Sequence, residues 1–216
     1  MKKMKVLFLA PHPFFQERGT PIDDLLILRV LATRDDVEVD MVSYHEGTDI
    51  EIPGVTFFRT RHLPFIKNIR PGFSMKKLVC DVFLFFKAGQ LIRKKRYDLI
   101  HAVEEAGFIA LFFRLLNGTQ YIFDMDSSIS QQLVESRPFL KIFSPFFDWM
   151  EGLLIRNSIV NFPVCNALAD FCKTHGSKKT VTVHDISQLP NPGAPRTGRL
   201  KKELKIQGLL ILYAGN

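Results

Sequence analysis

The sequence has few cysteines, and none of them has the spacing of a familiar cysteine site. Cys80, Cys165 and Cys172 do not form a metal-binding pattern, and an odd number of cysteines does not suggest a disulfide framework. The simplest interpretation is buried thiols in a reducing compartment. We therefore expect a cytoplasmic protein whose cysteines form neither a disulfide nor a metal site.

Long apolar runs are missing as well. Asp81 and Lys87 interrupt one apolar stretch and Arg114 interrupts another, so no segment has the roughly 20 apolar residues of a membrane span. The run Val6–Ala10 is too short for the apolar part of a signal peptide, and no cleavage pattern follows it. The sequence predicts neither a transmembrane helix nor a secretion signal.

Two common glycine-rich phosphate-binding patterns are absent. The loop Pro11–Pro21 contains a single glycine, Gly19, and matches neither G-x-G-x-x-G nor G-x-x-x-x-G-K-[ST]. A P-loop NTPase is thereby excluded, and a dinucleotide site has no support. Gly19 still precedes an expected helix start, where backbone N–H groups suit a phosphate, although a tight turn alone would also explain it.

The positive charge is concentrated in one segment. The chain has 216 residues and a formal net charge of +7. Between Arg59 and Arg96 it has eleven lysines and arginines and a single acidic residue, so this segment carries +10 and the remainder −3. A near-neutral body with one basic segment points to a localised anionic partner.

Short apolar runs alternate with segments of helical periodicity. This alternation indicates a parallel sheet covered on both faces, which is a doubly wound, Rossmann-like α/β domain. The expected strands are Val6–Ala10, Val37–Tyr44, Val55–Thr60, Asp98–Val103, Gln120–Phe123, Ser158–Phe162 and Thr180–His184. The expected helices are Pro21–Thr33, Met75–Arg96, Glu104–Leu116, Ser127–Val134, Phe139–Arg156 and Ala167–Thr174.

The helix expected from Met75 to about Arg96 contains apolar residues at spacings of three and four, after Ser74 as a suitable N-cap. Such spacings predict one apolar face toward the core. The residues predicted on that face are Leu78, Val79, Val82, Phe85, Phe86, Gly89 and Ile92.

The composition changes near the carboxyl end. Residues 187–198 are rich in proline and glycine, which is typical of a linker. We expect residues 1–186 to form one domain and residues 199–216 to begin a second, with a strand at Leu209–Tyr213. A single new strand cannot make a domain, so the second domain is expected to be truncated.

Polar and ionisable residues follow several of the expected strands. Ligands of open α/β sheets bind beyond the carboxyl ends of the strands, so these residues are candidates for a site. The simpler alternative is a histidine packed near the core and glutamates that favour a helix amino terminus. The candidates are His101, Glu104, Glu105, Asp124, Asp126 and Asn166.

The pair Asp124 and Asp126 also suggests a rival function. Two aspartates one residue apart after an apolar strand are typical of haloacid-dehalogenase-type phosphatases, where one is the nucleophile, the other an acid/base, and Mg²⁺ screens both. In those enzymes the motif opens the fold, whereas here more than half of the chain precedes it. The sequence also lacks a later acidic pair to complete a Mg²⁺ site.

The basic segment favours a membrane surface over nucleic acid, since no nucleic-acid-binding module is recognisable. Phenylalanines and leucines interleaved with cations suit an anionic bilayer, and a membrane-binding module without enzymatic activity is a third hypothesis. A solvated charged face is the plain alternative. The candidate membrane contacts are Arg70, Lys76, Lys77, Arg93, Lys94, Lys95 and Arg96.

Several short motifs, in this order, resemble the amino-terminal domain of family 4 glycosyltransferases, which have the two-domain GT-B fold. They run over the whole chain. They are Lys5–Pro11, Arg18–Ile22, Val37–Val42, Tyr97–Ala102, Tyr121–Ser127 and Leu209–Asn216. The last motif resembles the first strand and glycine turn of the donor-binding domain.

The resemblance implies sugar transfer from a nucleotide-sugar to a sugar or lipid-linked acceptor, with retention at the anomeric carbon and no metal. Many members end the fourth strand in His-x-His. Here His101 is followed by Val103 at the second position, which leaves Glu104 as the better polar candidate. The implied catalytic residues are His101, Glu104 and Asp126. The implied phosphate or acceptor contacts are Arg18, Gly19, Thr20, Glu105, Asp124, Asn166 and Gly215.

Together these features predict the acceptor-side half of a transferase for polysaccharide or glycolipid synthesis. We expect no cofactor besides the donor substrate, no nucleic-acid partner, and a cytoplasmic location at the inner face of the cell membrane. The half by itself is expected to be inactive.

Overall fold

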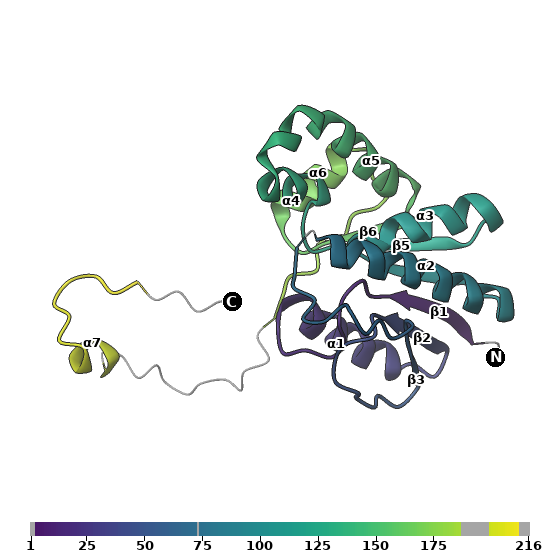
Figure 1. Cartoon of the computed structure of the whole chain (residues 1–216), viewed down its shortest axis with the longest axis horizontal. Helices are drawn as coiled ribbons and strands as arrows, with labels where there is room; N and C mark the ends of the chain where they lie inside the picture. The colour runs from purple at the N-terminus through teal and green to yellow at the C-terminus, as the bar shows by residue number, and fades with distance from the viewer. Residues whose placement is uncertain (1–2, 73, 187–198, 212–216) are drawn as a thin grey trace. The chain divides into compact units, whose positions relative to one another are not determined.

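The structure is a computed structural model that describes residues 3–72, 74–186 and 199–211. The described residues fall into two units, one that ends at Asp185 and one that begins at Ile186 (Figure 1). The first unit contains a six-stranded sheet with its helices. In the second, the described residues form the short helix α7 (Arg199–Glu203).

The sheet of the first unit is parallel throughout, with the strand order β3-β2-β1-β4-β5-β6. Consecutive strands are joined through helices or longer connections, which parallel pairing requires. The doubly wound α/β prediction is therefore confirmed. The strands are β1 (Met4–Leu9), β2 (Val37–Ser43), β3 (Val55–Arg59), β4 (Leu99–Val103), β5 (Gln120–Met125) and β6 (Val160–Pro163).

The helices follow the predicted segments with small shifts at their ends. The segment predicted as the helix Phe139–Arg156 is a 3-10 helix followed by an α-helix. Pro138 begins the first and Pro145 lies at the start of the second, where the missing backbone donor of proline is tolerated. The helices are α1 (Gly19–Ala32), α2 (Met75–Lys94), α3 (Ala106–Asn117), α4 (Ile129–Ser136), η1 (Pro138–Phe143), α5 (Ser144–Asn157) and α6 (Asn166–Thr174).

The two faces of the sheet contribute to two separate apolar clusters. Side chains alternate along a strand, so Val6 and Phe8 of β1 join one cluster while Leu7 and Leu9 join the other. The cluster around Phe8 includes Leu25 and Leu28 of α1. The cluster around Leu7 includes buried residues of α2, α3, α5 and α6. Side chains on both faces of β1 are thus buried, which explains why its sequence is a continuous apolar run.

The prediction of which α2 face meets the core is wrong. The buried residues are Lys77, Cys80, Leu84, Ala88 and Leu91, which also recur at spacings of three and four. Much of the predicted face is exposed instead, including Leu78 (47%), Val82 (49%) and Phe86 (63%). This helix is apolar on most of its circumference, so periodicity alone does not select a face.

Two other predictions fail or stay open. Thr180–His184 is not a strand: it makes an isolated bridge to Asn161, and only Val181 and Val183 donate backbone hydrogen bonds toward β6. Residues 209–211 of the expected later strand are irregular, and its remainder lies outside the described residues. The predicted linker, 187–198, lies outside them too, so the domain boundary stays a prediction.

The assignment of the α2 face can be tested by one substitution at two positions. Leu84→Ala removes a fully buried side chain and should lower the free energy of unfolding by about 2–5 kcal/mol. Leu78→Ala, the same change on the exposed face, should cost less than about 1 kcal/mol. Urea denaturation of both variants measures the difference. Equal losses would mean that the helix is rotated relative to this structure.

Candidate active site at the carboxyl edge of the sheet

The candidate site lies where the strand order reverses. β1 and β4 are neighbours, yet the chain continues from β1 to β2 on one side and from β4 to β5 on the other. Loops after two such strands diverge and leave a crevice at the carboxyl edge of the sheet, where ligands of these folds bind. The loop after β1 and the residues after β4 and β5 therefore meet at one place.

His101 and Asp124 form a buried pair at this edge. His101 Nε2 lies 2.7 Å from Asp124 Oδ2, and both side chains are almost fully buried. The ring of His101 stacks on Phe8, with centroids 4.4 Å apart. These contacts fix the ring of His101 and occupy one carboxylate oxygen of Asp124.

His12 and Asp24 form a second buried pair. His12 Nε2 lies 2.8 Å from Asp24 Oδ2, which links the loop after β1 to α1. Burial lowers the pKa of His12 to about 4 and raises the pKa of Asp24 well above its usual range. Burial therefore disfavours the charged form of both groups.

Asp126 lies just after β5 and faces the start of α1. The Thr20 side chain hydrogen-bonds to Asp126, which joins two candidates from distant parts of the sequence. Burial raises the pKa of Asp126 to about 9, and the charges of Asp124 and Glu104 add to the rise. Asp126 is consequently protonated at neutral pH and can donate a hydrogen bond, as a carboxylate cannot.

Lys77 holds the two glutamates that follow β4. Its Nζ contacts a carboxylate oxygen of Glu105 and lies 3.6 Å from Glu104 Oε2. Burial raises the pKa of both glutamates, while the charge of Lys77 opposes the rise. Glu104 has a φ of +44°, a left-handed conformation that costs a non-glycine residue about 1 kcal/mol or more. The contacts around Glu104 stabilise this strained backbone.

The remaining candidates from the sequence are Arg18, Gly19, Asn166 and Gly215, and their surroundings differ. Gly19 is the first residue of α1, and a Cβ added there would have no atom within 4 Å, so its surroundings are open. Arg18 donates a hydrogen bond to the Ile69 carbonyl oxygen, 3.1 Å away. Asn166 begins α6 and is exposed, and no contact among the described residues joins it to the cluster. Gly215 lies outside the described residues.

Two of the predicted membrane contacts are directed inward. Lys77 is buried in the cluster described above, so its assignment to the surface is wrong. Lys95 Nζ lies 2.6 Å from Glu38 Oε1 and 2.8 Å from Asp40 Oδ2, so its charge is neutralised within the protein. The other five are exposed: Arg70, Lys76, Arg93, Lys94 and Arg96.

Carboxyl groups outnumber cations in the cluster. The acidic side chains are Asp23, Asp24, Glu104, Glu105, Asp124 and Asp126, beside Lys77. Burial and the charge of Asp124 raise the pKa of Asp23 to about 6. The described residues contain no group of three His, Cys, Asp or Glu side chains arranged for a metal ion. With Asp124 bonded to His101 and Asp126 protonated, the pair required by the phosphatase hypothesis is not preformed.

The sequence reasoning missed His12 and Asp24 as members of this site. His12 stands in the loop after the first strand, which is the signal that selected the other candidates. Asp24 lies near the start of a helix, where the helix dipole by itself would explain an acidic residue. Its partner is 12 residues away along the chain, so no local pattern could identify the pair.

Several solved structures have a fold similar to that of this chain. No family model and no curated protein sequence matches this chain. Sucrose-phosphate synthase from Thermosynechococcus elongatus matches with a TM-score of 0.65 and 16% identity, covering 86% of this chain and 49% of that one. A UDP-glucosyltransferase from Polygonum tinctorium matches with a TM-score of 0.57 and 9% identity, covering 96% and 58%.

A third structure, a UGT transferase from Siraitia grosvenorii in complex with UDP, matches with a TM-score of 0.54 and 11% identity, covering 87% of this chain and 52% of that one. The fold matches the Rossmann-like domains of GT-B glycosyltransferases. At these identities the likeness establishes the fold of the domain. The chain spans about half the length of each of these GT-B structures.

The protonation of Asp126 can be tested through the pH dependence of stability. Its pKa is about 9 in the folded domain and about 3.8 in the unfolded chain, so between these values the folded state binds more protons. Stability is therefore lost as the pH rises, with a slope of at most about 1.4 kcal/mol per pH unit. Asp126→Asn removes this contribution and should gain stability relative to the natural chain from pH 5.5 to pH 8.

The measurement is urea denaturation at several pH values. Asp35→Asn changes an exposed aspartate near the end of α1 and serves as the matched control, with no comparable trend expected. A difference between Asp126→Asn and the natural chain that does not vary with pH would contradict the protonated state.

Proposed function

We propose that this chain is the acceptor-side domain of a retaining, family 4-type glycosyltransferase that acts in polysaccharide or glycolipid synthesis. The observation that carries the proposal is the cluster of polar side chains at the switch point of a sheet whose fold matches GT-B domains. Ligands of such sheets bind at this point. Four of the short motifs that resemble family 4 enzymes have residues near this edge: Lys5–Pro11, Arg18–Ile22, Tyr97–Ala102 and Tyr121–Ser127.

In this proposal the donor is a nucleotide-sugar whose diphosphate approaches the amino terminus of α1. Backbone N–H groups at a helix start bind phosphate oxygens, and the open space at Gly19 leaves room for that approach. The leaving diphosphate needs further donors and cations to stabilise its developing charge. The proposal assigns those groups to a donor-binding domain that the described residues do not include.

The acceptor hydroxyl is assigned to the carboxyl groups that remain accessible. Glu104, whose side chain is 15% exposed, and Asp126 are the groups placed to contact it. His101 is a positioning residue in this scheme, because it is hydrogen-bonded to Asp124. No metal is assigned a role, and the nucleotide-sugar is a substrate rather than a resident cofactor.

Transfer assays on two lengths of protein test this function. The chain alone should show no measurable transfer from UDP- or GDP-sugars, because it supplies only part of the contacts to the diphosphate. The same chain joined to its donor-binding domain should transfer sugar. In that longer protein, Glu104→Gln should lower kcat/KM by roughly 10²-fold, while Glu135→Gln, an exposed glutamate of α4, should leave it unchanged.

Robust transfer by the chain alone would contradict the division into two halves. Full activity of Glu104→Gln in the longer protein would contradict the assignment of the acceptor hydroxyl to this edge.

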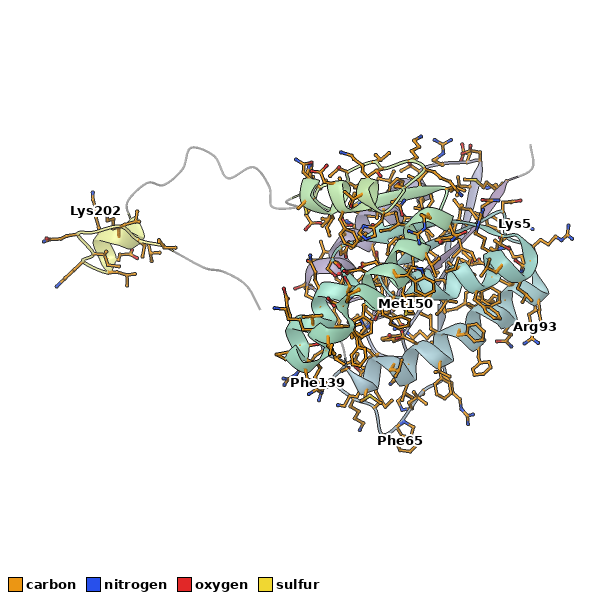
Figure 2. All side chains as sticks on the ribbon, turned by 90° about the horizontal axis from the view of Figure 1, so that it is seen from above. Lys5, Phe65, Arg93, Phe139, Met150 and Lys202 are labelled. Atoms are coloured by element: carbon orange, nitrogen blue, oxygen red, sulfur yellow. The ribbon has the colours of Figure 1, made fainter. Side chains whose placement is uncertain are left out.

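A second proposal, compatible with the first, is that the outer face of α2 docks on an anionic membrane. Exposed apolar side chains of this helix, including Met75, Leu78 and Phe86, adjoin exposed cations at its two ends. Phe65, in the segment before α2, is 85% exposed and projects from the lower edge of the domain in Figure 2, while Arg93 lies at its right edge. Apolar and cationic side chains on one surface suit the boundary of an anionic bilayer. No described helix is long and apolar enough to cross one.

Charge reversal tests the docking surface. The chain should bind vesicles that contain phosphatidylglycerol, and binding should weaken with salt. Arg93→Glu with Lys94→Glu should reduce the partition coefficient more than about tenfold, at roughly 1 kcal/mol for each basic residue near the surface. The control variant, Lys178→Glu with Lys179→Glu, makes the same change of charge at two exposed lysines outside this surface. It should reduce the partition coefficient less. Equal losses would contradict this surface.

A further inference from the structure

A cavity of about 270 Å³ lies beside the glutamates that follow β4, between α2, α3 and the start of α4. Leu78 lines it and is also exposed on the outer face of α2, so the cavity reaches the molecular surface there. One part of its wall is apolar and is formed by Leu78, Phe108, Ile109, Ile129 and Leu133. The cavity thus adjoins the candidate site and the exposed face of α2.

The polar part of the wall is rich in carboxyl groups. Asp81, Glu104 and Glu105 line it, and Lys77 is the one cation among its described lining residues. That cation already contacts both glutamates. Asp81 accepts a hydrogen bond from the buried Tyr44 hydroxyl. Ser127 and Gln132 also line the cavity, so among the described lining residues a ligand meets carboxyl acceptors and neutral polar groups, and no cation without a partner.

We propose that this cavity binds the acceptor of the transferase, and that the acceptor is a neutral amphiphile: an alkyl or aryl group that carries a hydroxyl. This inference rests on the function proposed above and adds the substrate class. The apolar wall takes the hydrocarbon part, and the hydroxyl donates to the carboxyl groups. An anionic ligand, such as a fatty acid or a phosphorylated lipid head, is disfavoured because it would bring a like charge to the glutamates.

The size of the cavity agrees with such a ligand. An apolar cavity of roughly 150 Å³ holds a benzene molecule, so this one has room for a ring with several further carbon atoms or for a short alkyl chain. A second hollow of about 130 Å³ shares Phe108, Ile129 and Leu133 with it and extends toward Phe147 and Met150 of α5. A longer hydrocarbon chain could continue along this second hollow.

A titration with 1-hexanol, the shorter alcohol 1-butanol and the six-carbon anion hexanoate tests the ligand class on the 216-residue chain. The methyl signals of Ile109 and Ile129 are followed by NMR while 1-butanol, 1-hexanol or sodium hexanoate is added. Hexanol should shift both signals, each CH₂ group from butanol to hexanol should tighten binding about fourfold, and hexanoate should bind at least about tenfold more weakly. Ile142, which is 79% exposed, reports non-specific binding and should not shift.

Leu133→Trp fills the cavity and should abolish the hexanol shifts, whereas Leu115→Trp at an exposed position of α3 should leave the affinity within twofold. If Leu133→Trp does not fold, Ile129→Phe, followed at Ile109, gives the same test with a smaller change. Shifts that spread equally to Ile142, persistence of binding in the filled variant, or hexanoate binding as tightly as hexanol would each overturn the proposal. The titration measures binding and not sugar transfer. A negative result would therefore overturn the proposed ligand class without deciding whether the protein is a transferase.

Discussion

The contact between Lys77 and the two glutamates after β4 is the interaction on which the site depends most. A lysine is seldom buried without a partner, because an unpaired ammonium group loses its hydration. Glu104 and Glu105 supply that partner, and in doing so they turn one side of α2 toward the sheet. The same contact stabilises the left-handed backbone of Glu104 and forms the polar wall of the cavity. Removing Lys77 would therefore alter helix packing, backbone strain and electrostatics together.

The remaining polar groups of the edge are arranged in hydrogen-bonded pairs that span the topology. His12 joins Asp24, His101 joins Asp124, and Thr20 joins Asp126, so α1 is connected to the ends of β1 and β5. Buried polar groups of this kind are stable only when each finds a partner. Burial also raises the pKa of several carboxyl groups, and that of Asp126 reaches about 9, so the edge offers a hydrogen-bond donor as well as acceptors.

This chemistry is consistent with the division of labour in a two-domain transferase. The chain spans about half the length of the GT-B structures that it matches, and its fold agrees with one domain of that architecture. Among the described cations of the basic segment Arg59–Arg96, Lys77 is the one that contacts the carboxyl groups at the edge of the sheet. Those that remain exposed lie on α2 or in the segments that flank it, beside apolar side chains that the core leaves uncovered.

The sequence by itself determined the doubly wound fold, six of the seven strands expected before residue 187 and the edge of the sheet where the site lies. Periodicity and strand ends are local signals, and parallel strands bring their carboxyl ends together whatever the details of packing. Only the tertiary structure decided which side of α2 is buried, because the helix is apolar on most of its surface and its neighbours make the choice. It also decided the His12–Asp24 pair and the inward direction of Lys77, since their partners are 12 and 28 residues distant in the sequence. The order of residues along a chain carries no direct signal for contacts of that kind.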